Sequence, residues 1–300
     1  MWHMNRIYSH IYKGLAVLSI VTVLHSCSLF GAIDSPEDKD NISFTVSEWI
    51  STKGAITTEA TIEDFGLYGY LFSAPWDAFN KPDFICNEKV TRSSGWATQY
   101  LYPNDGRYLR FYAYSPYGCA GLTLPDATTP GAIRIKYTVP ESVENQKDLM
   151  VSISDDILGR GATGSINMTF HHTLTAVRFA TGPEIKEGLI KSIRIRGIYN
   201  TGTLVYGETP TAKSTWYLGE TKGDFTLNDL NKAVDAGSEN VSITNQNQYF
   251  MLLPQTLPSG AALEIVFFDG TKDHVLTKLI EGQTWPQGEI VTYKISTTSI

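Results

Sequence analysis

The three cysteines of this 300-residue chain carry its most distinctive side-chain chemistry, and Cys27 stands in the most informative context. It ends an apolar run that follows the basic residues Arg6 and Lys13, and no acidic residue comes before Asp34. A short basic start, an apolar run and a small residue before a cut site are typical of a signal for export. The run is shorter than the roughly 20 apolar residues that cross a bilayer. We therefore expect residues 1–26 to be a signal peptide.

The end of this run, Leu24-His25-Ser26-Cys27, resembles the lipobox of bacterial lipoproteins. In such proteins a peptidase cuts before the cysteine, and the thiol carries a diacylglycerol. His25 departs from the pattern, because Ala, Ser, Thr or Gly is commoner there. Acyl chains on Cys27 would hold the mature chain to a membrane, at about 0.8 kcal/mol per buried CH2 group. The alternatives are a soluble secretory signal with a chance cysteine, or a free N-terminal extension.

The other two cysteines, Cys86 and Cys119, leave two readings open. They could form a disulfide in an oxidising compartment, but their spacing does not indicate it. Two buried free thiols fit the sequence equally well.

Residues that could ligate a metal or catalyse a reaction do not converge. His171 and His172 are adjacent, so in a strand they point to opposite faces and cannot form one ligand pair. His274 is alone in the sequence. EF-hand spacing is missing around the candidate acidic ligands, which are Asp155, Asp156, Asp224 and Asp229. Phosphate-loop, Gly-x-Ser-x-Gly and His-Glu-x-x-His motifs are missing as well. We expect no enzyme activity, no metal site and no cofactor.

Two tryptophans could contact a ligand. Trp76 lies between Pro75 and Asp77, and Trp216 also lies outside a clear apolar run. Large aromatic side chains on loops can stack on sugars, although they more often pack within the fold. Both readings stay open for Trp76 and Trp216.

The charge balance excludes some partners. Without residues 1–26 the chain has 31 acidic residues and 22 basic ones (24 less Arg6 and Lys13), a formal net charge of −9. Nucleic-acid binding needs a basic face, and so does a polybasic grip on anionic lipid. The chain is also rich in Tyr, Gly and Pro, which is typical of a β-rich exported protein.

The elements expected from the sequence are almost all strands. Residues 27–41 have low hydrophobicity and several charges, which predicts a solvated tether. Alternation of apolar and polar residues then predicts short strands separated by turn residues. The expected strands are residues 42–46, 65–72, 96–102, 108–114, 132–139, 149–153, 166–170, 174–179, 189–197, 202–206, 249–253, 263–268, 275–279 and 290–295.

Many short strands with turns between them predict sandwiches or barrels. The glycine-rich stretch at residues 159–164 suggests a boundary, so we expect two tandem β-sandwich domains, residues 42–160 and 161–300. Residues 226–236 are the only stretch that predicts a helix, because Leu227, Leu230 and Val234 would share one helical face.

Six segments resemble, in this order, motifs of the fimbrillin-like (Mfa-like, FimA-type) family of Bacteroidales surface proteins. The resemblance extends over nearly the whole mature chain, from about residue 42 to residue 296. The segments are Phe65-Gly-Leu-Tyr-Gly-Tyr70, Leu109-Arg-Phe-Tyr-Ala-Tyr-Ser-Pro116, Gln146-Lys-Asp-Leu-Met150, Phe170-His-His-Thr-Leu-Thr-Ala-Val-Arg-Phe179, Leu253-Pro-Gln-Thr-Leu257 and Trp285-Pro-Gln-Gly-Glu-Ile-Val-Thr-Tyr293.

This resemblance implies two transthyretin-like Greek-key β-sandwich domains and a role in type V pili, as a stalk, anchor or tip subunit. Stalk subunits of the family travel as lipoproteins, lose an N-terminal strand to a protease and receive a strand from another subunit. Here the removable strand would be residues 42–50, with Ile42, Phe44 and Val46 facing inward. The cut would fall near Lys53 and Gly54.

Two features depart from the stalk pattern. Family cleavage usually follows Arg, and the first Arg after Cys27 is Arg92, inside the first domain. Either the protease accepts Lys, such as Lys39 or Lys53, or this subunit keeps its lipid, which would suit an anchor subunit. Only residues 296–300 follow the last expected strand, fewer than the about ten residues of a full donor strand. A donor would then be a terminal strand that swings out, or this subunit does not donate. We expect an anchor, tip or accessory subunit, lipid-anchored at the outer membrane and contributing to surface adhesion. The alternative is a surface lipoprotein that binds a glycan or a host protein and does not polymerise.

Overall fold

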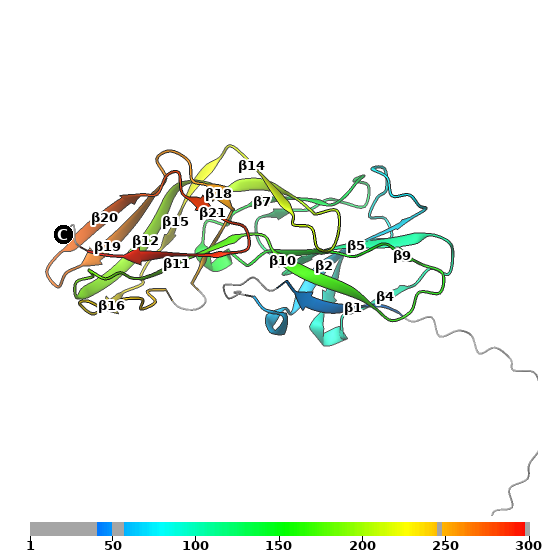
Figure 1. Cartoon of the computed structure of the whole chain (residues 1–300), viewed down its shortest axis with the longest axis horizontal. Helices are drawn as coiled ribbons and strands as arrows, with labels where there is room; N and C mark the ends of the chain where they lie inside the picture. Colours follow the sequence, from blue (N-terminus) through cyan, green and yellow to red (C-terminus); the bar gives the residue numbers. More distant parts are fainter. Residues whose placement is uncertain (1–40, 50–56, 245–247, 298–300) are drawn as a thin grey trace, which may run out of the picture. The chain divides into compact units, whose positions relative to one another are not determined.

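The computed structural model describes residues 41–49, 57–244 and 248–297. Strands dominate this part of the chain, so the expected all-β fold class is confirmed (Figure 1). Its helices are three single 3-10 turns, η1 (Glu59–Thr61), η2 (Arg92–Ser94) and η3 (Val143–Asn145). Within the described residues, no helix has the length and hydropathy needed to cross a bilayer.

The largest sheet, which we call the large sheet, has eight strands. They are β1 (Asn41–Glu48), β2 (Asp64–Phe72), β3 (Ile85–Thr91), β4 (Ala97–Leu101), β5 (Tyr108–Ser115), β8 (Met150–Ile153), β9 (Ile157–Leu158) and β10 (Ser165–His172). Their order is β3-β2-β5-β8-β10-β1-β4, and β9 pairs with β5 beside this path. Neighbouring strands are antiparallel except β1 and β10, which are parallel. The first strand of the described chain is thus an interior strand of this sheet.

A four-stranded sheet, which we call the cover sheet, combines both halves of the sequence. Its strands are β6 (Leu122–Thr123), β7 (Arg134–Thr138), β13 (Thr201–Val205) and β14 (Thr215–Leu218). Their order is β14-β13-β7-β6, so a hairpin from the second half pairs with strands from the first.

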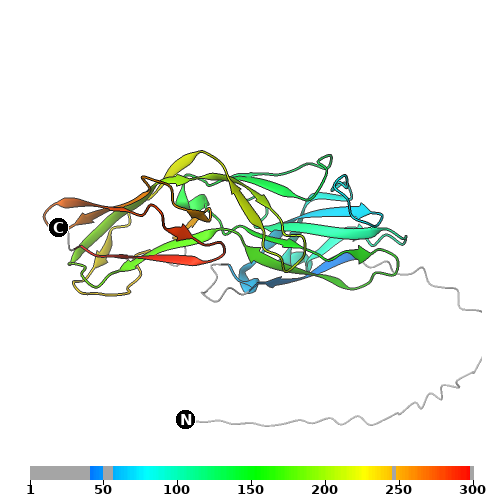
Figure 2. The ribbon, with the colours of Figure 1, turned by 45° about the horizontal axis from the view of Figure 1, so that its top comes forward.

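Three further sheets hold the remaining strands, which come from the second half of the chain. Their orders are β15-β12-β19-β20 with β16 on β12, β17-β11-β22, and β18-β21. The bounds are β11 (Thr175–Thr181), β12 (Gly188–Tyr199), β15 (Lys222–Leu227), β16 (Lys232–Val234), β17 (Phe250–Leu252), β18 (Gln255–Thr256), β19 (Ala262–Phe268), β20 (Asp273–Leu279), β21 (Thr284–Trp285) and β22 (Ile290–Ile295). Figure 2 shows β22 and β11 side by side, as their parallel register requires.

The large sheet is apolar on both faces, which explains why β2 reads as a nearly continuous apolar run. Phe65 and Leu67 of β2 face one way, and Tyr68 and Tyr70 belong to the core on the other side. Gly66 lies between Phe65 and Leu67 in the sequence, and a side chain is not tolerated there because a Cβ atom would lie 2.2 Å from the Tyr114 ring. A strand between two apolar layers needs apolar residues at consecutive positions, whereas a half-exposed strand such as β7 alternates buried and exposed residues.

The layer on the β1 side forms a separate cluster, which we call the β1 core. Its buried members are Ile42, Phe44, Val46, Ile62, Phe65, Leu67, Ile85, Val90, Tyr102, Leu109, Phe111, Ala113, Met150, Ile166, Met168 and Phe170. The residues come from β1, β2, β3, β5, β8 and β10, with additions from the loops. The other face of the large sheet packs against the cover sheet, in a cluster that continues into the second half of the chain.

Three strand pairs cross the expected boundary between residues 160 and 161. After that boundary, β10 pairs with β1 and β8 of the large sheet, and the chain then passes directly into β11 of another sheet. Likewise β12 pairs with β19, and β13, which follows after a single residue, pairs with β7. The two halves of the sequence are therefore interlocked by shared sheets.

The expected helix at residues 226–236 is wrong. The segment forms the end of β15, a turn and β16, both paired with β12. Asp229 and Asn231 have positive φ angles of 56° and 41°, which an α-helix does not allow. Leu227 lies in β15 and Val234 in β16, and both side chains are buried. Their spacing in the sequence matches that of a helical face by coincidence.

Every strand expected from the sequence overlaps a strand of the structure. The strands that the sequence did not predict are β3, β6, β9, β14, β15, β16, β18 and β21. Most are short, and β3 has only two buried side chains and a register shift against β2. Such strands carry too few alternating apolar residues to be recognised in a sequence.

Candidate functional site

The candidate site is β1 together with the strands on either side of it. β1 runs parallel to β10, in register from Ser43 opposite Ser165 to Glu48 opposite Phe170. On its other side it pairs with β4, where the Phe44 amide donates to the Trp96 carbonyl at 3.1 Å. In Figure 1, β1 lies beside both β10 and β4. Taking β1 away would leave unpaired main-chain groups on two strands.

The inward face of β1 is apolar and fully packed. Ile42, Phe44 and Val46 are 0, 3 and 6% exposed, as the alternation of the sequence predicted. The Phe44 ring lies 5.7 Å from the Phe65 ring and 5.4 Å from the Phe111 ring, edge to face in both pairs. Edge-to-face pairs add to the stabilisation that burial alone gives.

The outward face of β1 is polar and makes weak contacts. Ser47 and Thr169 share a hydrogen bond of 3.1 Å between their hydroxyl groups, and Thr45 is exposed. Specific recognition of β1 therefore depends on its inward face and its main chain.

A buried charged cluster, which we call the end cluster, closes the C-terminal end of β1. It consists of Glu48 of β1, His172 of β10 and Asp148, with side chains 9, 7 and 4% exposed. His172 Nδ1 lies 3.0 Å from an Asp148 oxygen, and its Nε2 lies 3.3 Å from a Glu48 oxygen. Burial lowers the pKa of His172, but hydrogen bonds and charge from Asp148 and Glu48 outweigh this, so the pKa is raised.

The same carboxylates also hold the chain that follows β1. The Thr57 amide donates to Asp148 at 3.1 Å, and the Glu59 amide donates to Glu48 at 2.9 Å. These bonds fix the chain where it returns to the described part of the protein. The end cluster thus joins β1, β10 and the chain leading to η1.

The roles of Glu48 and Asp148 were not predicted from the sequence. Glu48 continues the inward alternation of Ile42, Phe44 and Val46, and a charge in such a position signals a buried ionic partner. The alternation could therefore have indicated that Glu48 has a buried partner, but nothing in the sequence identifies His172 as that partner. His171, in contrast, faces Pro210 and stacks on Trp49, so the two histidines do diverge.

Three of the predicted site residues lie outside the described residues. Cys27, the expected lipid attachment site, lies before residue 41, and Lys53 and Gly54, the expected cut, lie between residues 49 and 57.

The two candidate ligand-binding tryptophans lie in different parts of the fold. Trp76, in the loop after β2, packs against Tyr70 and Phe72, and the Arg110 guanidinium lies 4.3 Å from its ring centre. Trp216, in β14, donates its indole N–H to the Thr173 carbonyl at 2.7 Å. Both side chains are partly exposed.

The strongly exposed aromatic rings are other residues. Phe79 is 83% exposed on the Trp76 loop, and Tyr217 is 63% exposed in β14. Neither residue is one of the two aromatic side chains that were predicted to contact a ligand.

The two described cysteines are free thiols. Cys86 is exposed in β3, and Cys119 is partly buried in the loop after β5. Burial raises the pKa of the Cys119 thiol to about 12, so it is a poor nucleophile.

Within the described part of the chain, no group of three or more His, Cys, Asp or Glu side chains is arranged so that it could hold a metal ion. His274 bonds Asp269 at 2.7 Å, and Asp224 pairs with Arg194. These residues form local ion pairs and turns.

Comparison with known proteins gives a consistent result. A family model described as fimbrillin-like matches residues 39–299. The fimbrium subunit Fim1C of Phocaeicola vulgatus is 25% identical over 211 residues, which cover 62% of this chain and 55% of that protein. The chain thus matches little more than half the length of this curated relative.

Solved structures share the fold. A fimbrial protein from Bacteroides vulgatus superposes with a TM-score of 0.56 at 16% identity, covering 85% of this chain and 96% of that one. A Bacteroides ovatus protein with a proposed role in cell adhesion gives 0.53 at 15% identity, covering 85% and 91%. Because the family model spans nearly the whole described chain, the protein belongs to the fimbrillin-like family, whose members are structural proteins of surface fimbriae rather than enzymes.

Proposed function

We propose that the protein is a fimbrial subunit in which β1 is a replaceable strand. The observation that carries this proposal is the position of β1: an interior strand with an apolar face, hydrogen-bonded on both sides, at the start of the described fold. Strand addition from a partner would restore the main-chain bonds and refill the pockets of alternate side chains.

The energetics favour replacement over simple loss. Each of Ile42, Phe44 and Val46 contributes about 1.5–3 kcal/mol by burial. A subunit without β1 would expose the β1 core and two strand edges, so it would gain this free energy back only when another strand enters. Assembly would therefore be driven by the same contacts that hold β1.

Within a fimbria, the features of the N-terminal segment suit an anchor, tip or accessory position. The chain has no Arg between Cys27 and Arg92, and a protease that needs Arg would leave β1 in place. A subunit that keeps residues 27–50 also keeps the acyl chains on Cys27. The proposed location is the outer surface of the cell, with the lipid in the outer membrane and the fold contributing to adhesion.

Strand replacement can be tested with the mature chain carrying Cys27→Ser and a specific protease site in place of residues 51–55. After cleavage, a labelled peptide of residues 41–49 should exchange into the site of β1, and fluorescence anisotropy would follow its uptake. The uncleaved protein is one matched control: it keeps its strand tethered in the β1 site, so only uptake beyond that of the uncleaved protein reports exchange there. A peptide with Phe44→Asp is the other, because it cannot fill the Phe44 pocket.

Uptake of the unmodified peptide but not of the Phe44→Asp peptide supports a replaceable strand. Formation of oligomers by the cleaved chain supports it as well. A cleaved chain that stays monomeric and takes up no more of the unmodified peptide than the uncleaved chain does contradicts it. That result would favour a non-polymerising surface lipoprotein, for which the exposed Phe79 on the Trp76 loop would be the first ligand-binding surface to examine.

A further inference from the structure

Two strand edges are free on one side of the second half of the fold. Within the described residues, β20 is hydrogen-bonded only to β19, and β22 only to β11. The outer edge of each strand therefore offers main-chain donors and acceptors to an added strand.

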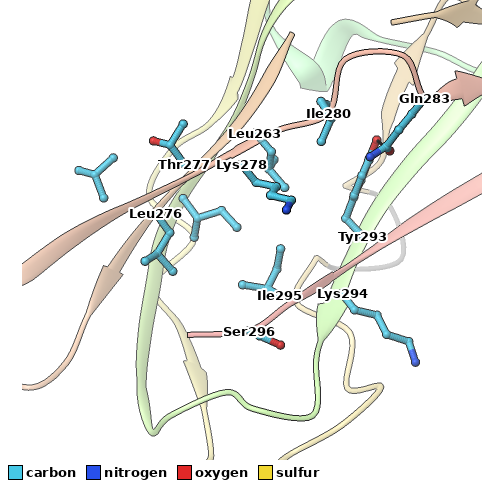
Figure 3. Close-up of a pocket in the computed structure, with 12 residues that line it drawn as sticks. Leu263, Leu276, Thr277, Lys278, Ile280, Gln283, Tyr293, Lys294, Ile295 and Ser296 are labelled. Carbon is cyan, nitrogen blue, oxygen red and sulfur yellow. Dashed lines mark hydrogen bonds between the residues drawn. The ribbon is translucent and has the colours of Figure 1, made fainter. Parts of the chain in front are cut away.

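A cleft of about 460 Å³ lies between these two edge strands (Figure 3). Its floor is apolar and consists of Leu263, Ile265, Leu276, Ile280 and Ile295. Four of these five side chains are otherwise buried in the core, so the cleft reaches the interior of the fold from the side.

One charged side chain lies at an inward position of the free edge. Lys278 alternates with His274 and Leu276 along β20, and Figure 3 shows it among the side chains lining the cleft. No hydrogen bond or ion pair joins its ammonium group to another described residue. None of the residues that line the cleft is acidic, although the whole chain has a formal net charge of −7. The cleft thus suits an apolar strand that carries one carboxylate.

We propose that this cleft accepts residues 41–49 of a second copy of the chain, added as a strand to the free edge of β20. The proposal rests on the proposed function, because β1 of the second copy must first leave its own site. A subunit that is not cut keeps its displaced β1, and an unpartnered apolar strand needs a new partner or aggregates.

The inward face of β1 has the chemistry that the cleft requires. Ile42, Phe44 and Val46 are three alternate apolar residues, and Glu48 follows them on the same face. Placed beside β20, the apolar side chains would enter the cleft and the Glu48 carboxylate would meet Lys278. Opposite charges on neighbouring strands stabilise pairing. β1 has 8 residues and β20 has 7, so the two edges match in length.

The test uses the intact mature chain with Cys27→Ser, whose own β1 still fills its site. A fluorescein-labelled peptide of residues 40–49 is titrated with this protein and binding is followed by anisotropy. Lys278→Glu should weaken binding about tenfold, since an attractive cross-strand pair becomes a repulsive one. Lys81→Glu makes the same change of charge at an exposed loop residue that does not line the cleft, so this control should leave binding unchanged.

A peptide with Glu48→Lys should bind the Lys278→Glu protein and restore the affinity. Methylation of alternate peptide amides should abolish binding to every variant, because it removes the donors of strand pairing. These results together support the proposal.

Equal binding to the wild-type, Lys278→Glu and Lys81→Glu proteins would overturn it. Failure to bind the intact chain would also overturn it, and would mean that Lys278 only protects a free edge from unwanted pairing. If the peptide then enters the chain whose β1 has been cut, the proposed function stands and this inference alone fails.

Discussion

Phe44 is the side chain on which the packing of β1 depends most. It is the largest of the three inward residues, and its ring touches both Phe65 of β2 and Phe111 of β5. Its neighbours Ile42 and Val46 extend the same contact along the strand. Loss of the ring would leave a cavity in the β1 core.

Phe44→Ala should therefore lower the free energy of unfolding by about 3–5 kcal/mol, the usual cost of removing a buried phenyl ring. Chemical denaturation followed by tryptophan fluorescence measures this difference. Thr45→Ala, one residue along on the exposed face, is the matched control and should change stability little. Equal effects of the two substitutions would mean that β1 does not pack as described.

The burial of this face is the part of the site that the sequence could predict. Ile42, Phe44 and Val46 alternate with polar residues, and alternation is a local signal. The partners of Glu48 could not be predicted this way. His172 and Asp148 lie 124 and 100 positions away in the sequence, and no periodic pattern links them to β1.

At the scale of elements, the end cluster determines how firmly the C-terminal end of β1 is held. The groups that face His172 within ion-pair distance are Glu48, from β1, and Asp148, from the chain before β8. His171 is the neighbouring titratable group on β10, and burial lowers its pKa. Protonated His172 balances two carboxylates, so its charge state should affect β1.

The sign of the pH dependence follows from the direction of the shift. Because the pKa of His172 is raised in the folded protein, its contribution is complete below its ordinary pKa of about 6.5. It is lost as the pH rises through the raised value. Because the pKa of His171 is lowered in the folded protein, that residue takes up protons on unfolding at pH values below about 6.5. Its effect on stability therefore has the opposite sign to that of His172, and it appears at lower pH.

His172→Gln should destabilise the protein by about 3–5 kcal/mol near pH 6, because it leaves two buried carboxylates without their cation. The difference from wild type should shrink as the pH rises above 6.5. Denaturation curves from pH 6 to 9, with hydrogen exchange of the β1 amides, measure both effects. His274→Gln, at a surface pair with Asp269, should leave β1 exchange unchanged. A difference that stays constant with pH would exclude a role for the His172 charge.

Elements could be predicted where apolar residues alternate over five or more positions, as in β1 and β7. The helix expected at residues 226–236 was wrong because two strands and a turn happened to space Leu227, Leu230 and Val234 by three and four residues. Tertiary pairing with β12 decided that segment, and a local pattern does not contain such pairing.

At the scale of the whole molecule, the sequence predicted the all-β fold class but not how the halves combine. Interlocking arises because β10 and β13 pair with strands that are remote in the sequence. The glycine-rich stretch at residues 159–164 is only a turn between β9 and β10 of the same sheet. Composition marks turns, and it does not say which sheet the next strand will join.

The proposed attachment to the outer membrane also belongs to this scale, since it places the entire fold at the cell surface. Cys27→Ala removes the thiol that would carry the acyl chains, so the protein should leave the membrane fraction or stall during export. Fractionation of cells followed by immunoblotting shows either outcome. Cys86→Ala, at an exposed thiol in β3, is the matched control and should keep the wild-type distribution. Unchanged membrane association of Cys27→Ala would exclude a lipid anchor at this residue.

The parallel pairing of β1 and β10 has a mechanical consequence. A pull along β1 loads its six register pairs with β10 in shear, so that the bonds must yield together instead of opening one after another. Resistance to such a force is set by the rate of unfolding. A donor strand in the same register would form a joint that withstands tension along the fibre, yet a sideways peel from one end could still open it.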